Sequence, residues 1–287
     1  MAVRIVTDSA CSVSADERQR LSIVRVPLHV HGADGEIPLA EQEAPSFFDQ
    51  LADMESLPTT SQPTPGEFLI TFRRILSEGH DVLAVLISGG LSGTVESAVS
   101  AIQTIRHETP DARIEVVDSR SNSMEEGYAV LSAAEAAYGG ASIETCRQAA
   151  LETIRRTRFL FTPHTLDYLR RGGRITGASA LLSVMLKIAP ILTAENGETG
   201  IAGVARGARS ARQKVVSLMR KDVDRFGLRR AAVQYIADAE EALRFAKEAI
   251  EPIVGAAVPI VPIPAVVGLH VGPAVGVVYE TIEPMRD

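Results

Sequence analysis

Residues 82–98 read VLAVLISGGLSGTVESA, and the predicted fold is built outward from this segment. It begins with an apolar run rich in valine and isoleucine, which is typical of a parallel strand buried on both faces. Glycines and serines follow, and then residues that favour a helix. A strand that turns directly into a helix leaves backbone N–H groups without partners at the helix start. Together with the hydroxyls of Ser88, Ser92 and Thr94, these N–H groups predict a cradle for an anionic group.

The same alternation of strand and helix patterns surrounds this stretch from residue 1 to residue 157. Strands are expected at 3–7, 23–30 and 114–117, and helices at 46–53, 65–76, 94–107, 124–138 and 143–156. Ser92 or Thr94 is expected to cap the helix at 94–107, and residues 59–62 to form an extended polar loop. Thr64, Pro65 and Glu67 together mark the start of the helix that follows this loop. The pattern predicts an α/β domain at residues 1–157, with a mostly parallel sheet covered on both faces.

The rhythm changes after residue 157. Strands are expected at 159–161, 188–193, 201–205, 231–236, 258–263 and 275–279, and helices at 165–170, 179–185, 210–225 and 238–251. The Asn196-Gly197 pair predicts a hairpin turn. His270 is expected to lie between the last two apolar strands. Residues 158–287 are therefore predicted to form an α+β domain with a mixed sheet.

Composition narrows the class of protein. The 287 residues carry a formal net charge of −7, which argues against a partner that is nucleic acid. Two cysteines in no paired motif predict neither a zinc site nor a disulfide framework, and they favour a cytoplasmic protein. No apolar run is long enough to span a membrane, and the N-terminal residues do not resemble a signal peptide. His29, His31 and His164 are too scattered to indicate a metal site, so we expect no metal and no cofactor.

Several motifs occur in an order that resembles the DegV family of bacterial lipid-binding proteins. These motifs are Thr7-Asp8-Ser9, Thr60-Ser61-Gln62-Pro63, Leu91-Ser92-Gly93-Thr94, Asp118-Ser119, Arg171-Gly172-Gly173-Arg174-Ile175 and Gly268-Leu269-His270-Val271-Gly272-Pro273. They extend over nearly the whole chain. The sequence departs from the family pattern at Lys187-Ile188-Ala189-Pro190, where the family commonly has a lysine-proline pair, and at Val95, where an aromatic residue is frequent.

The resemblance implies a protein that is not itself an enzyme. It would bind one long-chain fatty acid in a tunnel between two domains and present the carboxylate to a separate ATP-dependent fatty acid kinase. The acyl phosphate formed there would enter phospholipid synthesis. Carried over to this sequence, the carboxylate site comprises Thr60, Ser61, Ser92, Gly93, Thr94 and His270. Arg174 and Arg206 would face the kinase.

The energetics of a fatty acid agree with such a site. Each buried methylene contributes about 0.8 kcal/mol, so a C16 tail would contribute on the order of 10 kcal/mol. A hydrogen bond to a charged group contributes roughly 1.5–3 kcal/mol, part of which offsets desolvation of the carboxylate. We therefore expect the tail to dominate affinity and the head-group site to fix orientation. Hydroxyls, turn amides and one imidazole would provide the donors without an arginine clamp.

Two alternatives from other classes remain open at this point. A serine hydrolase or acyltransferase would use Ser92 as nucleophile and His270 as base, although the G-x-S-x-G pattern fails because Thr94 stands at the last glycine. A phosphosugar- or nucleotide-binding module would use the glycine turns, although the loop at residues 172–177 lacks the lysine of a P-loop. Taken singly, each of these residues also has an ordinary structural explanation. Ser92 could lie in a turn, Thr60 in a loop, His270 in the core and the arginines on the surface.

Overall fold

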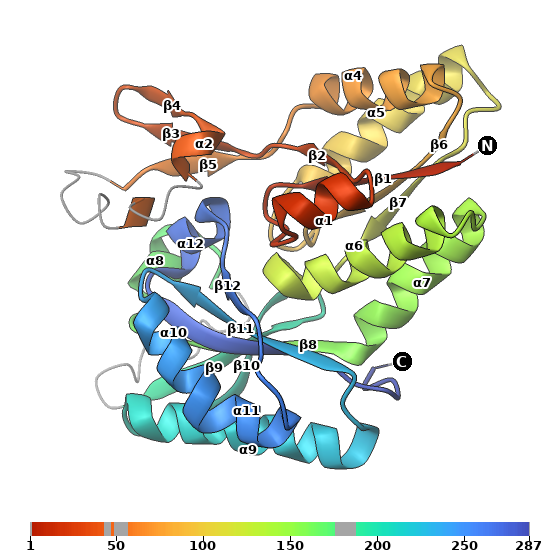
Figure 1. Cartoon of the computed structure of the whole chain (residues 1–287). Coiled ribbons are helices and arrows are strands. Elements are labelled where there is room, and N and C mark those ends of the chain that lie inside the picture. Colours follow the sequence, from red (N-terminus) through yellow and green to blue (C-terminus); the bar gives the residue numbers. More distant parts are fainter. Residues whose placement is uncertain (1, 43–46, 49–56, 176–187, 287) are drawn as a thin grey trace.

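The computed structural model describes residues 2–42, 47–48, 57–175 and 188–286. The helices expected at 46–53 and 179–185 therefore fall largely or wholly outside the described residues, as does Lys187. Figure 1 shows the chain in two halves, with the N-terminal elements from red to yellow on one side and the blue C-terminal elements on the other.

The N-terminal half is built on a four-stranded parallel sheet with the order β2-β1-β6-β7. Its strands are β1 (Val3–Asp8), β2 (Val24–Val26), β6 (Asp81–Leu86) and β7 (Ile114–Asp118). One face is covered by α4 (Pro65–Ser77) and α5 (Thr94–Glu108), and the other by α6 (Ser123–Tyr138) and α7 (Ile143–Arg156). All six residues of β6 are buried, because both faces of this central strand lie under helices. The expected parallel sheet with two covered faces is confirmed.

A three-stranded antiparallel sheet with the order β4-β3-β5 lies beside this half. It comprises β3 (His29–Gly32), β4 (Gly35–Ile37) and β5 (Thr59–Ser61), while short helices occur at α1 (Ala15–Arg20) and α2 (Leu39–Gln42). Two expectations are wrong here. The single strand expected at 23–30 is split into β2 and β3, with Pro27 between them, where no N–H is available for a ladder. Residues 59–61 form a strand rather than a loop, because Thr60 pairs with Val30.

The C-terminal half contains a mixed six-stranded sheet with the order β10-β9-β8-β13-β11-β12. Its strands are β8 (Thr157–Pro163), β9 (Ala189–Glu195), β10 (Glu198–Ala205), β11 (Arg230–Ile236), β12 (Ile260–Pro262) and β13 (Ala274–Glu280). Only the β11–β12 pair is parallel among these pairings. The expected mixed sheet is confirmed, and β9 and β10 form the expected hairpin. The domain boundary at residues 157 and 158 stays a prediction.

The helices of this half include one that the sequence did not predict. They are α8 (Asp167–Arg171), α9 (Ala208–Phe226), α10 (Ala239–Phe245), α11 (Glu251–Val254) and α12 (Ala265–Val271), with a π-helical turn at Ala246–Ile250. The helix expected at 238–251 is present as one helical segment from Ala239 to Val254, with a π-helical turn at Ala246–Ile250 in its middle. His270 lies between the strands β12 and β13 along the chain, as expected, and the segment that carries it is the helix α12. Pro264 precedes this helix, at a place where a proline is compatible with a helix start.

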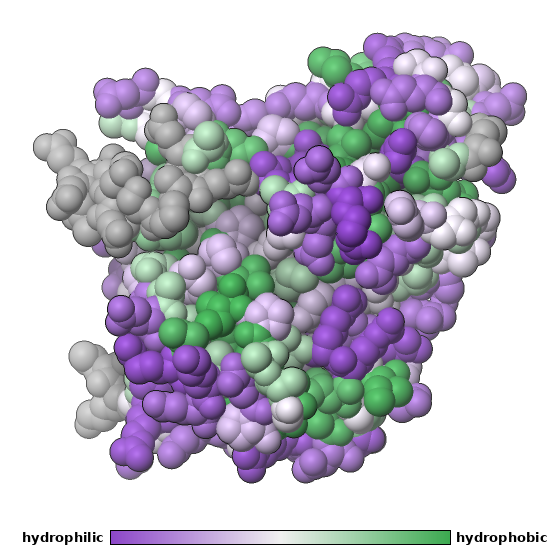
Figure 2. Space-filling model, viewed as in Figure 1, coloured by the Kyte–Doolittle hydropathy of each residue, from purple (hydrophilic) through white to green (hydrophobic). Residues whose placement is uncertain are grey.

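The core is arranged so that α6 is shared by both halves. This helix packs against β1 and β6 on one side and against β8 and β13 on the other, and most of its residues are buried. Burial on all sides is expected for a helix in such a position, and in α6 it extends to the side chains of Glu125 and Glu126. On the outer face of the second sheet, Leu160 and Ile191 pack beneath α9 with Val215 and Met219. Figure 2 shows a mostly polar outer surface, with apolar side chains gathered between the two halves on this face.

No helix within the described ranges is both long enough and apolar enough to cross a membrane.

Candidate functional site

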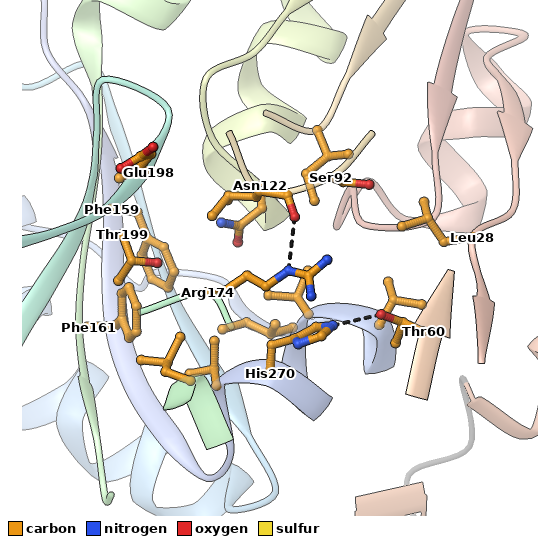
Figure 3. Close-up of a pocket in the computed structure, with 18 of the residues that line it drawn as sticks. Leu28, Thr60, Ser92, Asn122, Phe159, Phe161, Arg174, Glu198, Thr199 and His270 are labelled. Carbon is orange, nitrogen blue, oxygen red and sulfur yellow. Dashed lines mark hydrogen bonds between the residues drawn. The ribbon is translucent and has the colours of Figure 1, made fainter. Parts of the chain in front are cut away.

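A pocket of about 330 Å³ lies where the loops of the first sheet face the second sheet. Figure 3 shows its two sides, with Thr60 and Ser92 on one and Phe159 and Phe161 on the other. Its polar lining residues are Thr60, Ser61, Gln62, Ser92, Asn122, Arg174, Thr193, Glu198, Thr199 and His270. Its apolar lining residues are Leu28, Ile87, Leu91, Phe159, Phe161, Leu169, Ala194, Ile263, Val266, Val267 and Val271. The volume falls at the lower end of the range for small-molecule sites.

Thr60 and His270 join the two halves at one end of the pocket. Thr60 is on β5 and His270 is on α12, and the distance from Thr60 Oγ1 to His270 Nε2 is 2.7 Å. Burial, together with the nearby charge of Arg174, lowers the pKa of His270 to about 4. The imidazole is therefore neutral near pH 7. Its Nδ1 atom is buried without a hydrogen-bond partner among the described residues, beside Gly172, where a Cβ would overlap the ring.

The turn that carries Ser92 differs from its expected capping arrangement. Gly93 is the N-cap of α5 and no side chain caps the helix, so the prediction that Ser92 or Thr94 caps it is wrong. The two hydroxyls instead bond each other, with 2.8 Å between Ser92 Oγ and Thr94 Oγ1. Ser92 lines the pocket, whereas Thr94 is fully buried and Gly93 packs against Gln62, outside the lining. Ser92 is thus presented to the cavity, and its two neighbours support the turn.

Two carboxylates hold this turn from behind, and they come from the strands on either side of β6. Asp8 accepts hydrogen bonds from the Ala10 and Ile87 amides at 2.8 Å, and Asp118 accepts one from the Gly89 amide at 3.3 Å. Burial raises the pKa of Asp8 to about 6 despite these amide bonds. The side chains therefore position the chain between residues 87 and 92. This geometry agrees with the view that strand-ending aspartates cap the following turns.

Arg174 lies in the pocket wall. Its Nε donates to the Leu91 carbonyl at 3.1 Å, and its Nη1 donates to the Gly172 carbonyl at 2.6 Å. The sequence predicts only neutral donors around the head group, whereas the structure adds the cationic side chain of Arg174 to the pocket lining. Arg206 is exposed immediately before α9 and is not among the lining residues. The structure thus does not bring the two arginines together in one cavity.

The geometry does not assemble a hydrolase site. A nucleophile needs its base within hydrogen-bonding reach, and the base needs an orienting partner. Ser92 Oγ bonds Thr94, His270 Nε2 bonds Thr60, and His270 Nδ1 has no partner in the described part of the chain. The numerous apolar lining residues also differ from the polar interior expected for a phosphosugar or nucleotide site.

Sequence reasoning missed much of the pocket lining. Asn122 at the start of α6, Thr199 on β10 and Phe161 on β8 all line the pocket. Apolar strands do predict buried aromatic residues, but periodicity does not say which buried face borders a cavity. Val95, where the sequence departs from the family pattern, packs against the core that contains Phe68 and is not among the lining residues.

Comparison with known proteins places this architecture in a family. The model of the family described as "Uncharacterised protein, DegV family" matches residues 2–281. A DegV domain-containing protein from Clostridium acetobutylicum is 37% identical over 292 residues, covering 100% of both chains. A homologue of the same description from Deinococcus radiodurans is 33% identical, covering 98% of this chain and 99% of its own.

Solved structures agree with the sequence relatives. A DegV family protein from Thermus thermophilus, described by its fatty acid binding, is 32% identical with a TM-score of 0.88, covering 98% of this chain and 100% of its own. A stearic acid-binding protein from Eubacterium ventriosum is 26% identical with a TM-score of 0.82, covering 97% and 98%. The resemblance inferred from the motifs is therefore confirmed, and this chain belongs to the DegV family.

Proposed function

We propose that this protein binds a single long-chain fatty acid in the pocket between its two halves. The carboxylate would lie near Thr60, Ser61, Ser92 and His270, while Gly93 and Thr94 shape the turn that presents Ser92. The observation that carries the proposal is a pocket with apolar walls and a polar end joined by the 2.7 Å Thr60–His270 contact. Relatives of the same fold, from Thermus thermophilus and Eubacterium ventriosum, are described as binding fatty acid and stearic acid.

The protonation state of His270 supports a carboxylate as the ligand head group. A neutral imidazole carries one proton, and a buried nitrogen without a partner is better left unprotonated. Nδ1 is the nitrogen without a described partner, so the proton belongs on Nε2, which then donates to Thr60 Oγ1. The Thr60 hydroxyl is left with its own proton to donate. A carboxylate oxygen is an acceptor that this proton can reach.

Charges in the lining also favour one orientation of the ligand. Arg174 lies near His270, and its two carbonyl bonds use Nε and Nη1 but not Nη2. Glu198 lines the pocket from the β9–β10 hairpin. Figure 3 shows Glu198 on the side of Phe159, away from Thr60 and His270. An anionic head group would be attracted to Arg174 and repelled by Glu198, while the apolar chain follows the aromatic wall.

Native mass spectrometry of the purified protein, followed by lipid extraction, tests this proposal directly. We expect one fatty acid per chain, or stoichiometric uptake of added stearate by the delipidated protein. Recovery of no acyl chain together with no uptake would overturn the proposal.

We further propose that the bound carboxylate is presented to a separate ATP-dependent fatty acid kinase. Acyl phosphate would be formed in the cytoplasm, where ATP is available, and would supply phospholipid synthesis. The protein itself would hold the lipid and carry out no chemistry. Arg174 at the head-group end and the exposed Arg206 are the residues proposed to face this partner.

The kinase proposal is tested with a cognate kinase and the loaded protein. Arg174→Ala and Arg206→Ala are each expected to retain stoichiometric fatty acid and to lower the rate of acyl-phosphate formation. Lys247→Ala, a surface cation on the π-helical turn, is the matched control and should leave the rate unchanged. Unchanged phosphorylation in both arginine variants would refute the assigned docking surface.

A further inference from the structure

Thr199 places a hydroxyl beside the aromatic wall of the pocket. Its side chain is 7% exposed and borders the cavity, together with Phe159 and Phe161. Within the part of the chain that the structure describes, this hydroxyl makes no hydrogen bond. Its oxygen is not among the fully buried atoms without a partner, so it is open to the cavity and water can reach it in the empty protein. A purely hydrocarbon chain that fills the cavity would displace this water and leave the hydroxyl unpaired, which is unfavourable.

Strand pairing shows why Thr199 faces the cavity. Phe161 on β8 is opposite Leu192 on β9, so the two share one face of the sheet. Ala194 lies two residues after Leu192 on that same face, and Thr199 on β10 is opposite Ala194. Leu160 and Ile191 point to the other face, beneath α9. Thr199 therefore shares the aromatic face, and Figure 3 shows it beside Phe159 and Phe161.

The position of Thr199 sets it apart from the head-group residues. Thr60 and His270 lie on the opposite side of the pocket in Figure 3, with Arg174 and Asn122 between. A carboxylate held by Thr60 cannot also pair with Thr199, because the apolar chain extends from the head group toward the aromatic wall. In the loaded protein, a ligand group that pairs with Thr199 would therefore be carried by the chain itself.

We infer that the pocket accepts an oxygenated fatty acid, whose chain carries a hydroxyl or keto group that pairs with Thr199. This inference rests on the proposed function and specifies its substrate class. A threonine hydroxyl both donates and accepts, so it can pair with either oxygen function. A site that offers a hydrogen bond to a substrate oxygen discriminates against the analogue that lacks it, because the protein group is then left unpaired.

A thermodynamic cycle on the whole protein tests the inference. Dissociation constants of the delipidated protein are measured by titration calorimetry for stearate and for hydroxystearates with the hydroxyl at carbon 3, 6, 8, 10 or 12. The same ligands are measured with Thr199→Val, which keeps the shape of the side chain and removes its hydroxyl. The cycle isolates the hydrogen bond from the lower hydrophobicity of the hydroxylated chain.

For at least one positional isomer, we expect the affinity ratio of hydroxystearate to stearate to fall about threefold to tenfold in Thr199→Val. Thr199→Ser, which keeps the hydroxyl, should retain most of the wild-type ratio. Thr59→Val, a change of the same kind on the exposed β5 surface, should leave every ratio unchanged.

A ratio that stays within twofold of wild type for every isomer would overturn the inference, and would indicate that water satisfies Thr199. Equal loss in the Val and Ser variants would also overturn it, since the effect would then come from packing. In both cases stearate still binds, and the proposed function stands. Failure of the wild-type protein to bind stearate or any hydroxystearate would instead refute the proposed function.

Discussion

Thr60→Val tests whether the head-group end fixes orientation while the tail supplies most of the affinity. Valine has nearly the same shape as threonine, so the change removes one hydroxyl and little packing. In the proposed complex that hydroxyl donates to the carboxylate and accepts from His270 Nε2, 2.7 Å away. A hydrogen bond to a charged acceptor contributes roughly 1.5–3 kcal/mol, which corresponds to a Kd raised about tenfold to a hundredfold.

The tail contribution should survive this substitution. Burial of a C16 chain contributes on the order of 10 kcal/mol, and its apolar wall does not include Thr60. His270 loses its partner in both the free and the bound protein, so this loss should lower the free energy of unfolding by about 1–3 kcal/mol without adding to the affinity change. Thr59→Val, on the same strand and exposed, should change neither quantity.

Calorimetric titration with palmitate and with its methyl ester separates the head group from the tail. The substitution should weaken palmitate binding more than ester binding, because the ester carries no charge. Complete loss of palmitate binding in a folded variant would refute the claim that the tail dominates. An unchanged Kd would show that Thr60 does not contact the carboxylate.

Two further predictions concern the contact between the halves and its pH dependence. Gly90→Ala should lower the free energy of unfolding by about 1–3 kcal/mol in chemical denaturation, because its Cβ would lie 2.5 Å from the Gly197 carbonyl oxygen. Gly66→Ala, in the first turn of α4 with ordinary space around it, is the control. An equal loss in both variants would contradict the steric explanation. Burial lowers the pKa of His270 from 6.5 to about 4, so the unfolded chain binds this proton first and stability is lost as the pH falls through that interval, by up to about 3 kcal/mol. His270→Gln should remove this loss of stability, as measured by denaturation curves at successive pH values. Asp8 contributes in the opposite direction, because its raised pKa adds stability as the pH falls from about 6 to 3.8, but this contribution is common to both proteins. An unchanged pH profile of stability in the variant would refute the assignment of the loss to His270.

Local patterns predicted the elements whose formation depends on nearby residues. Thr64 and Glu67 form the reciprocal cap expected from their spacing, and α4 begins at Pro65 as predicted. The helix at 143–156 has the expected bounds, and its Ser142 N-cap is bonded to Thr145 N. In each case the decisive contacts are within a few residues along the chain, so the sequence is enough to identify them.

Other elements depended on partners that are distant in the sequence. The strand at 59–61 forms because Thr60 pairs with Val30, and no local pattern indicates this pairing. Ser92 was expected to act as a cap, but Gln62 packs against Gly93 and the Ser92 hydroxyl bonds Thr94. The placement of His270 on a helix likewise escaped prediction, because a short apolar segment is compatible with either helix or strand.

Hydrophobic periodicity and turn residues act locally, so they were enough to predict the two kinds of sheet, the buried strand at 82–86 and the polar turn that follows it. The family could also be inferred from ordered motifs. Three relations became visible only in the folded chain: Thr60 meets His270 across 210 positions of sequence, Arg174 enters the pocket wall, and Thr199 faces the aromatic side chains. These relations depend on the register between strands and on the packing of one half against the other. A one-residue change in register would turn Thr199 to the opposite face of the sheet, and nothing in its immediate neighbourhood of sequence fixes that choice.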